Sequence, residues 1–499
     1  MKKHLVSDLW QAQHGLVTAE SYSTAWLALV PDTAEPNRPA WPIALQTLRD
    51  SQLADGGWGD AAVYYPHDRL ISTLAALHTL LTWNHPCDEE RIERGVAVLS
   101  RYGQDLSQEW LDPIGFELLL PSLVHALEQL GLKLPRESWV DISETTQTKL
   151  NLIGNLEADP KKPRTWWFSM EMLPPTHLAT FPHAILDSYG AVATSSAATA
   201  GYLRAQRLHG RDLRPAAHYL NEVVKATRGG GNVTWPIDVF ELAWTLDNLR
   251  RAGASPTHPQ IAPMIWRLAS HWEFPPTGIT WNQAFQVQDG DHPAVAYKVL
   301  RWAGLSPSDE PLLKFWDEEC GVYKTYLDEH GSSISTSIHG LIAFRDNPHN
   351  KTHQRIATRL TEWLRQRVMG PEGFRDKWHL SPLYTAARLL PTLIGWDDEL
   401  ARYTLDFILS QQRPDGGWGA TIHSNLEETA LASLALSEAH MGGLFRANGE
   451  LRSANRFLAD KAHEMPTERL WIGKSLYLPI GVAQGTRYAA EMALARICQ

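Results

Sequence analysis

The sequence is poor in cysteine, in positive charge and in long apolar runs, and each shortage excludes a class of protein. Its three cysteines, Cys87, Cys320 and Cys498, are widely spaced and odd in number, so they form neither a disulfide framework nor a CxxC metal site. The 46 Lys and Arg residues are outnumbered by 56 Asp and Glu residues. This balance argues against nucleic acid as a partner, because phosphate binding needs clustered positive charge.

The same shortages bear on location. No apolar run approaches the roughly 20 residues that cross a bilayer, so we expect no membrane span. The first residues, MKKHLVSDLW, lack the apolar core of a signal peptide, and scattered cysteines suit a reducing compartment. We therefore expect a cytoplasmic protein. With 499 residues, 43% of them hydrophobic, the chain can bury a large core in two or three domains or in one large helical architecture.

One short segment occurs twice. Residues 52–59 read QLADGGWG and residues 412–419 read QRPDGGWG. In each copy Asp-Gly-Gly predicts a tight turn with positive φ, while the Trp packs back and the Gln bonds backbone groups at a helix end. A helical pattern follows each copy, at 69–83 and at 426–439. The repeat indicates a helical repeat architecture.

Amphipathic segments continue through the chain and are separated by Gly, Pro and Asp. They are 115–130, 195–208, 238–252, 294–303, 334–344, 383–393 and 400–411. Few period-two runs compete with them, so the predicted fold class is all-α. The turn-rich stretch 174–190 and the RGGGN run at 228–232 are candidate boundaries, and we place one boundary near residue 215. These features predict two α-helical barrels with a cavity between or within them.

A DGD triplet, Asp289 to Asp291, stands just before a helical pattern in the segment WNQAFQVQDGDHPAVAYKVLRWAG. Asp commonly caps helix N-termini, which is the purely structural interpretation. The functional interpretation is that one carboxyl is kept protonated and acts as a Brønsted acid. Spacing alone does not decide between the two.

Several segments, taken in order, resemble the class II diterpene cyclases, which protonate geranylgeranyl diphosphate and cyclise it while keeping the diphosphate. The resemblance covers nearly the whole chain, includes bacterial halimadienyl (tuberculosinyl) and kolavenyl diphosphate synthases, and is specific because the motifs occur jointly. The matching segments are SYSTAWLALV, SQLADGGWGD, GFELLLPSLVHAL, WPIDVFELAWTLDNL, VQDGDHPAVAYKVLR, SSISTSIHGL, FRDKWHLSPLYTAARLL, QQRPDGGWG and WIGKSLYLP.

The resemblance implies a double α-barrel of the βγ type, with the active-site cavity between the barrels. The γ domain would comprise residues 18–215. It would be inserted into a β domain made of residues 1–17 and 216–499, which carries the acid motif.

In the family's DxDD motif the middle Asp donates the proton, a position that corresponds to Asp291. The first Asp, here Asp289, would support it by hydrogen bonding. His292 stands where the family has Asp or Thr, and it either donates a hydrogen bond to Asp291 or faces elsewhere. If His292 is near, we expect it to be neutral, because a charged imidazole favours the carboxylate over the acid. A family Asn that bonds the acid corresponds to Ala284, so water or Asn282 would substitute.

A carbocation needs a wall that stabilises diffuse positive charge without attacking it, and aromatic faces provide one. Two or three of the aromatic residues at matching positions are expected to line the cavity, while most Trp belong to the core. The candidates are Trp166, Trp167, Phe168, Trp235, Trp281, Tyr297 and Tyr384.

In plant copalyl diphosphate synthases a His and an Asn hold the water that removes the final proton. Those positions correspond to Phe168 and Val233, and neither side chain accepts a proton. The resemblance therefore implies that the bicyclic cation survives to undergo 1,2-hydride and methyl shifts. The product would be a clerodane or halimane diphosphate, with kolavenyl favoured and halimadienyl next. His339, Tyr384 and His379 are candidates for the base that ends the reaction.

The diphosphate must be held without being expelled. The DDxxD motif of class I terpene synthases is absent, because Asp397-Asp398-Glu399-Leu400 is followed by Ala401. We therefore expect an isomerase with class II chemistry only. Glu109 and Asp112 lie near the family's acidic motif associated with magnesium, and two carboxylates with phosphate oxygens suit Mg²⁺. Candidate diphosphate ligands, which are otherwise solvated surface charges, are Lys149, Lys377, Lys474 and Arg375.

Other functions stay open from the sequence. One is cyclisation of farnesyl diphosphate to drimenyl diphosphate in a shorter cavity, and another is a copalyl-type labdane product. A helical-barrel glycosidase would need two carboxylates about 5 to 10 Å apart in an open groove, and a zinc prenyltransferase would need Asp, Cys and His ligands together. A non-catalytic α-barrel binding module is the last. For the cyclase the partners are a prenyl diphosphate and, by analogy, a downstream class I terpene synthase.

Overall fold

A computed structural model describes residues 15–108, 113–154, 156–272, 279–285, 287–327, 329, 333–447 and 449–498. The chain forms two compact units. Unit 1 consists of Met1–Gly15, Ile237–Glu468 and Pro479–Gln499, and unit 2 consists of Leu16–Pro236 and Arg469–Leu478.

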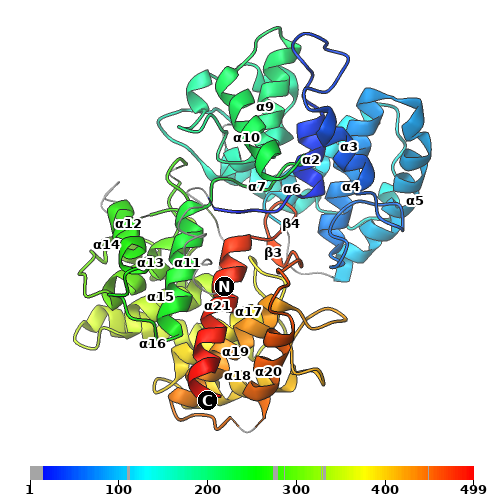
Figure 1. The fold of residues 1–499 in the computed structure, drawn as a ribbon. Helices are drawn as coiled ribbons and strands as arrows, with labels where there is room; N and C mark the ends of the chain where they lie inside the picture. Colours follow the sequence, from blue (N-terminus) through cyan, green and yellow to red (C-terminus); the bar gives the residue numbers. More distant parts are fainter. Residues whose placement is uncertain are drawn as a thin grey trace. The chain divides into compact units, whose positions relative to one another are not determined.

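Unit 1 is a barrel of helices in two layers (Figure 1). Its inner ring closes on itself, because α11, α13, α15, α17, α19 and α21 each contact the next and α21 contacts α11. The outer helices α12, α16, α18 and α20 pack against the ring. The bounds are α11 Asp238–Arg251, α12 Ala262–Trp272, α13 Asp291–Trp302, α14 Glu310–Leu313, α15 Ile334–Arg345, α16 Lys351–Val368, α17 Pro382–Leu393, α18 Asp398–Ser410, α19 Leu426–Met441, α20 Glu450–Asp460 and α21 Ile480–Ile497. Strands β1 (Trp316–Asp317) and β2 (Val322–Tyr323) form an antiparallel pair with Trp316 opposite Tyr323.

Unit 2 repeats the design with a ring of α2, α4, α6, η4 and α9, which closes because α9 contacts α2. Outside it, α3 packs on α2, α5 on α4, α7 on α6, and α8 and α10 on α9. The bounds are α2 Ser21–Ala28, α3 Pro42–Asp50, α4 Pro66–Trp83, η1 Pro86–Asp88, α5 Glu89–Asp105, η2 Leu106–Gln108, α6 Phe116–Gln129, η3 Arg136–Ser138, α7 Ser143–Ile153, η4 Thr165–Met172, α8 Pro175–Leu178, η5 His183–Ile185, α9 Ser196–Leu208 and α10 Arg214–Ala226. The antiparallel pair β3 (Trp471–Ile472) and β4 (Leu476–Tyr477) belongs to this unit.

The two layers differ in how their helices are buried, and the difference follows from the sequence. In the ring helix α15 every residue except Ile342 and Arg345 is buried, so apolar and small polar residues occur on all sides. The outer helix α16 instead buries one stripe, with Ile356, Leu360 and Leu364 at a spacing of four. A stripe of this kind is what a helix with one solvated face requires. The predicted all-α, barrel-forming fold is confirmed.

The repeated DGGWG segment forms the same turn in both units, as predicted. In the first copy Gly56 has a φ of +102° and Gln52 Nε2 donates to the Gly56 carbonyl at 2.8 Å. Trp58 is fully buried, and its Nε1 donates to the Leu48 carbonyl at 2.7 Å, at the end of the preceding helix α3. The second copy repeats this geometry at Gln412, Gly416 and Trp418.

The compact units divide the chain at other positions than the sequence-based boundaries at 17 and 215. Helix α10 falls in unit 2 because it packs against α9, so this unit extends to Pro236. The segment Arg469–Leu478 also returns to unit 2, which no composition shift indicates. Within the described residues, no helix has both the length and the apolar character that crossing a bilayer requires.

Candidate active site

Asp289 caps the ring helix α13, which begins at Asp291. Its Oδ1 accepts the backbone N–H groups of Asp291 and His292, each at 2.9 Å, and thereby satisfies two donors that a helix start leaves free. The structural interpretation of the triplet therefore holds for Asp289. Its oxygen bonds the backbone of Asp291 and not the Asp291 carboxyl. Asp289 therefore fixes the position of the Asp291 backbone, from which the side chain extends.

Asp291 is enclosed, with 12% of its side-chain surface exposed. Its Oδ1 lies 2.6 Å from His339 Nδ1 on the neighbouring ring helix α15. Among the described residues, Oδ2 of Asp291 has no hydrogen-bond partner. When the carboxyl is protonated and Oδ1 accepts a hydrogen bond, the proton is on Oδ2, and Oδ2 is therefore the atom that can donate it.

The charges around Asp291 favour its ionised form, whereas the functional interpretation of the triplet has one carboxyl kept protonated. Burial raises the pKa of the Asp291 carboxyl, but His339, His292 and Arg388 together outweigh burial and bring the pKa below its ordinary value. These groups stabilise the carboxylate that is left after the proton has gone. The site therefore differs from a merely apolar pocket, which would hold the proton more tightly.

His292 bonds Asp289 and not Asp291. Its Nδ1 lies 2.9 Å from Asp289 Oδ1, and its ring packs 5.1 Å from Trp244 and 5.5 Å from Phe240. Burial lowers the pKa of the His292 imidazole, but the Asp289 carboxylate outweighs this and leaves the pKa above its ordinary value. The neutral imidazole was expected for a His292 beside Asp291; its partner here is Asp289, which favours the charged imidazole.

His339 is the acid's partner, a role that the sequence did not reveal. It is separated from Asp291 by 48 positions, and only the contact of α13 with α15 joins them. Its ring meets Trp244 edge-on at 5.3 Å, so the two imidazoles of the site both contact this tryptophan. The Nε2 atom of His339 is buried and has no hydrogen-bond partner among the described residues.

An aromatic and cationic layer lies behind Trp244. Its Nε1 donates to the Tyr384 hydroxyl at 2.9 Å, and the Arg388 guanidinium lies 5.8 Å from the Trp244 ring. Arg388 is itself paired with the buried Asp247. His379 stacks on Tyr384 at 4.7 Å. Tyr384 thus belongs to the surroundings of the acid through its contact with Trp244.

The other predicted wall residues of unit 1 lie in ordinary packing contacts. Tyr297, on α13, meets Trp272 of the outer helix α12 at 6.2 Å. Trp281 is half-buried against Phe285 at 5.7 Å. Asn282 turns its Oδ1 to the backbone N–H of Ala284, at 2.7 Å, and its Nδ2 has no partner among the described residues.

In unit 2 the structure brings Phe168 and Val233 to one place. Lys474 Nζ lies 4.7 Å from the Phe168 ring centre, and Val233 packs so closely on Gly473 that a Cβ there would collide with it. Both residues are buried and apolar. The remaining predicted aromatics of this unit contact other rings: Trp166 contacts Trp167 and Phe181, and Trp235 contacts Tyr219 and Tyr189.

Lys474 differs from the other predicted diphosphate ligands because it is completely buried. Its Nζ donates to Glu171 Oε1 at 2.6 Å and to Ser195 Oγ at 2.7 Å, and Tyr22 donates to the same Glu171 oxygen at 3.0 Å. Burial lowers the pKa of the Lys474 ammonium, an effect that Glu171 opposes.

The remaining candidate ligands are accessible. Lys149 Nζ lies 3.7 Å from Glu117, with 20% of the lysine side chain exposed. Lys377 Nζ lies 3.1 Å from Glu329, with 29% exposed. Arg375 is exposed. The predicted magnesium ligands Glu109 and Asp112 lie outside the described residues.

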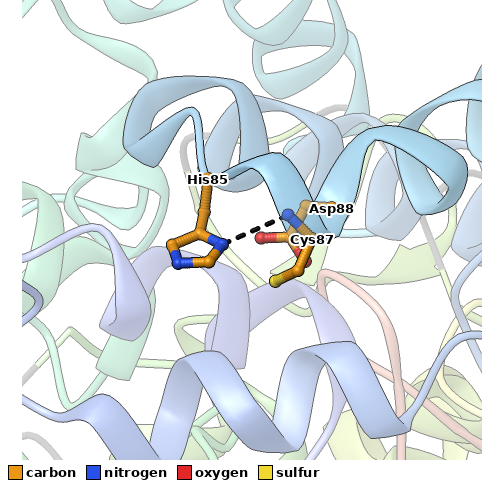
Figure 2. A group of neighbouring side chains, drawn as sticks. All are labelled: His85, Cys87 and Asp88. Atoms are coloured by element: carbon orange, nitrogen blue, oxygen red, sulfur yellow. Dashed lines mark hydrogen bonds between the residues drawn. The ribbon is translucent and has the colours of Figure 1, made fainter.

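A separate group of possible metal ligands occurs in unit 2, where ligand atoms of His85, Cys87 and Asp88 lie within 4.8 Å of one another (Figure 2). His85 Nδ1 accepts the Cys87 N–H at 3.2 Å. Arg49 binds both oxygens of the buried Asp88, at 2.7 to 3.2 Å, and Arg91 adds a second guanidinium at 3.6 Å. The only carboxylate of this group is therefore already neutralised, and a cation would have to displace an arginine.

Comparison with known proteins gives three kinds of result. No family model matches the chain. A type B diterpene cyclase of Mycobacterium tuberculosis is 30% identical over 95% of this chain and 95% of its own length. A chloroplastic (−)-kolavenyl diphosphate synthase of Tripterygium wilfordii is 32% identical over 62% of this chain, which spans 37% of that plant protein.

Solved structures agree in fold. The ent-copalyl diphosphate synthase of Streptomyces platensis superposes with a TM-score of 0.75 at 24% identity and covers 99% of both chains. The ent-copalyl diphosphate synthase of Arabidopsis thaliana gives a TM-score of 0.69 at 24% identity over 98% of this chain and 62% of that one. Because the mycobacterial relative matches over nearly all of both sequences, the chain belongs to the class II diterpene cyclases, which are isomerase-type terpene cyclases.

Proposed function

We propose that this enzyme protonates the terminal double bond of geranylgeranyl diphosphate and converts it to a rearranged bicyclic diphosphate. One observation carries the proposal. Asp291 is held at the start of α13, is bonded through Oδ1 to His339 at 2.6 Å, and has an Oδ2 without a partner among the described residues. A carboxyl bonded in this way can present one proton to a carbon base and keep its anion stabilised.

In the first step the O–H bond at Asp291 Oδ2 breaks and a C–H bond forms, with the electrons supplied by the alkene. The positive charge appears on the neighbouring tertiary carbon, and the next two double bonds close two rings. The His339 N–H continues to donate to Oδ1 and stabilises the new carboxylate. Because the C–O bond that joins the prenyl chain to the diphosphate is not broken, the diphosphate stays on the product.

For the product we favour kolavenyl diphosphate, with halimadienyl diphosphate next. The support is that Phe168 and Val233 are buried, apolar and unable to take a proton. Without a base there, the first bicyclic cation would persist long enough for hydride and methyl shifts. The name of the Tripterygium relative agrees with this choice.

Of the three candidate terminal bases we favour His339. Tyr384 already accepts the Trp244 N–H, and His379 Nδ1 accepts the Ser381 N–H at 3.0 Å, which places the His379 hydrogen on Nε2. His339 keeps a nitrogen without a partner among the described residues. With its hydrogen on Nδ1 toward Asp291, this Nε2 holds a lone pair that can accept a proton.

The proposal includes Mg²⁺ as a companion of the diphosphate, because two or more phosphate oxygens with carboxylates suit this ion. Lys377, Lys149 and Arg375 are reachable by an anion, whereas Lys474 would first have to leave Glu171. We further propose that the enzyme works in the cytoplasm beside a class I terpene synthase, which would ionise the retained diphosphate of the product.

The proposal is tested by incubating purified protein with geranylgeranyl diphosphate, with Mg²⁺ or with EDTA, followed by dephosphorylation and mass spectrometry. We expect a clerodane alcohol, formed faster with Mg²⁺. A labdane as main product would contradict the argument from Phe168 and Val233. Turnover of farnesyl diphosphate alone would favour drimenyl diphosphate synthesis. Inertness toward every prenyl diphosphate would favour a binding module.

A further inference from the structure

Strand β2 and the residues after it run beside the acid loop. Gly290 N–H donates to the Thr325 carbonyl at 2.8 Å. A Cβ on residue 290 would collide with the carbonyl oxygen of Lys324, so glycine permits this close approach. Tyr323, the last residue of β2, is thereby placed next to the Asp289–Asp291 triplet. It has no role in the mechanism above.

The Tyr323 ring is tightly enclosed. It is fully buried and lies 6.4 Å from Phe315 and 5.9 Å from Phe344. On its other side is Gly340, the neighbour of His339, where a Cβ would lie 2.7 Å from the ring. The ring is thus fixed by the same helix, α15, that carries the acid's partner, and its hydroxyl has little freedom to turn elsewhere.

Two buried polar atoms here lack hydrogen-bond partners among the described residues. One is the Tyr323 hydroxyl, and the other is Oδ2 of Asp289, a residue that is 1% exposed. Burial first, and then the charges of Asp291 and Asp289, raise the pKa of Tyr323 well above its usual value. The hydroxyl therefore keeps its hydrogen and is a donor within the electrostatic reach of these two carboxyl groups. Buried polar groups of this kind are regularly bridged by one ordered water.

We propose that Tyr323 is a positioning residue for the acid, and that its hydroxyl donates through one buried water to Oδ2 of Asp289. This inference rests on the proposed role of Asp291. When Asp291 gives up its proton, two carboxylates stand two residues apart, and their repulsion opposes the step. A donor on Asp289 draws its negative charge away from Asp291, which makes Asp291 the stronger acid. Tyr323 acts through Asp289 and does not touch the substrate.

Several charged or titratable groups lie around the acid and Tyr323. Asp289 lies just before α13, Asp291 and His292 lie on α13, His339 lies on α15, and Arg388 lies on α17 behind Trp244. Tyr323 is the donor from β2. Loss of its hydroxyl leaves the other groups in place, so the expected effect is a weaker acid in an unchanged site.

Tyr323→Phe tests the proposal, because the substitution removes one oxygen. We expect kcat to fall roughly 10- to 100-fold, the effect typical of supporting residues around an active site, with KM changed less than about twofold. The product should stay the same. The alkaline limb of the kcat–pH profile should move to higher pH, because Asp291 loses acid strength. Tyr202→Phe is the matched control: Tyr202 is equally buried, its hydroxyl donates to the Phe181 carbonyl in unit 2, and its loss should leave kcat unchanged.

A second variant separates positioning from packing. Replacement of Tyr323 by 3-fluorotyrosine keeps the hydroxyl in a nearly identical shape and should restore kcat to within about twofold of the unaltered enzyme. Wild-type kcat and pH profile in Tyr323→Phe would overturn the proposal, as would an equal loss of kcat in both variants. If the unaltered protein forms no cyclic product, the proposed function has failed. If it does and Tyr323→Phe is fully active, only this inference has failed.

Discussion

Two buried charged groups, one in each unit, show opposite ways of holding a charge. In unit 2 the ammonium of Lys474 and the carboxylate of Glu171 are both completely enclosed, and Ser195 and Tyr22 add hydrogen bonds. In unit 1 the Asp291 carboxyl is bonded through one oxygen only, and 12% of its side chain is exposed.

The difference lies in what each group has left to offer. A buried ion pair resists change, since either member alone would be an uncompensated charge. Asp291 is hydrogen-bonded to an imidazole and not to a permanent cation, so its carboxyl can exchange a proton while its anion stays stabilised. The surroundings of Asp291 thus suit chemistry, and those of Lys474 suit structure.

The largest effect should come from removing the proton itself. Asp291→Asn keeps the shape of the side chain and an oxygen for His339, but has no acidic hydrogen. We expect product formation to fall at least about a thousandfold, with a melting temperature close to that of the unaltered protein. The measurement is product per folded molecule by mass spectrometry, with thermal unfolding as control. Substantial residual cyclisation would place the acid elsewhere.

For Lys474 in unit 2 the comparison predicts a loss of stability instead of a loss of catalysis. Lys474→Met leaves Glu171 buried without its counter-charge and should lower the free energy of unfolding by about 3–5 kcal/mol. The double variant Lys474→Met, Glu171→Leu removes both charges and should recover most of that loss. Denaturant unfolding of the three proteins measures it. If Lys474→Met were as stable as the unaltered protein but bound the substrate poorly, Lys474 would be a diphosphate ligand instead.

A third test uses pH. Burial raises the pKa of Glu20 in unit 2 to about 7 from 4.5. Between these two pH values the folded state keeps a proton on Glu20 that the unfolded chain releases. The stability that this proton contributes is complete below about pH 4.5, declines as pH rises, and is lost above about pH 7. The shift corresponds to about 3 kcal/mol. Glu20→Gln should make the free energy of unfolding less dependent on pH between these values, as urea unfolding at several pH values would show. An unchanged slope would mean that Glu20 is ionised in the folded protein.

The smallest expected effect concerns the helix cap beside the acid. Asp289→Asn keeps an oxygen for the backbone N–H groups of Asp291 and His292 but loses the charge that binds the imidazole. We expect a loss of about 0.5–2 kcal/mol of stability, within the range for helix caps. The pKa of His292 should also fall, because Asp289 is what raises it. Titration of the His292 ring by NMR would detect this, and an unmoved His292 pKa would contradict the assignment.

The sequence predicted much of the fold, which depends on local pattern, and it singled out Asp291 as the candidate acid. The DGGWG turns and the ring and outer helices follow from residue spacing, and the helix start at Asp291 follows from its capping residue. The partners of the charged groups could not be predicted from residue spacing. His339 meets Asp291 across 48 positions and Glu171 meets Lys474 across 303, so only the closed rings of helices bring them together. Whether His292 meets Asp291 stayed open from the sequence, because position in a motif does not fix the direction of a side chain.

The return of Arg469–Leu478 to unit 2 has a consequence for how the protein is made. On the ribosome, Glu171 is synthesised long before Lys474, so the nascent unit 2 carries an unpaired interior carboxylate until most of unit 1 has emerged. We expect a fragment ending at Pro236 to be degraded or to aggregate in cells. Supplying the missing ten-residue hairpin on a short linker should rescue it. The hairpin 469–478 would then complete the folding of a domain whose other residues were synthesised hundreds of positions earlier.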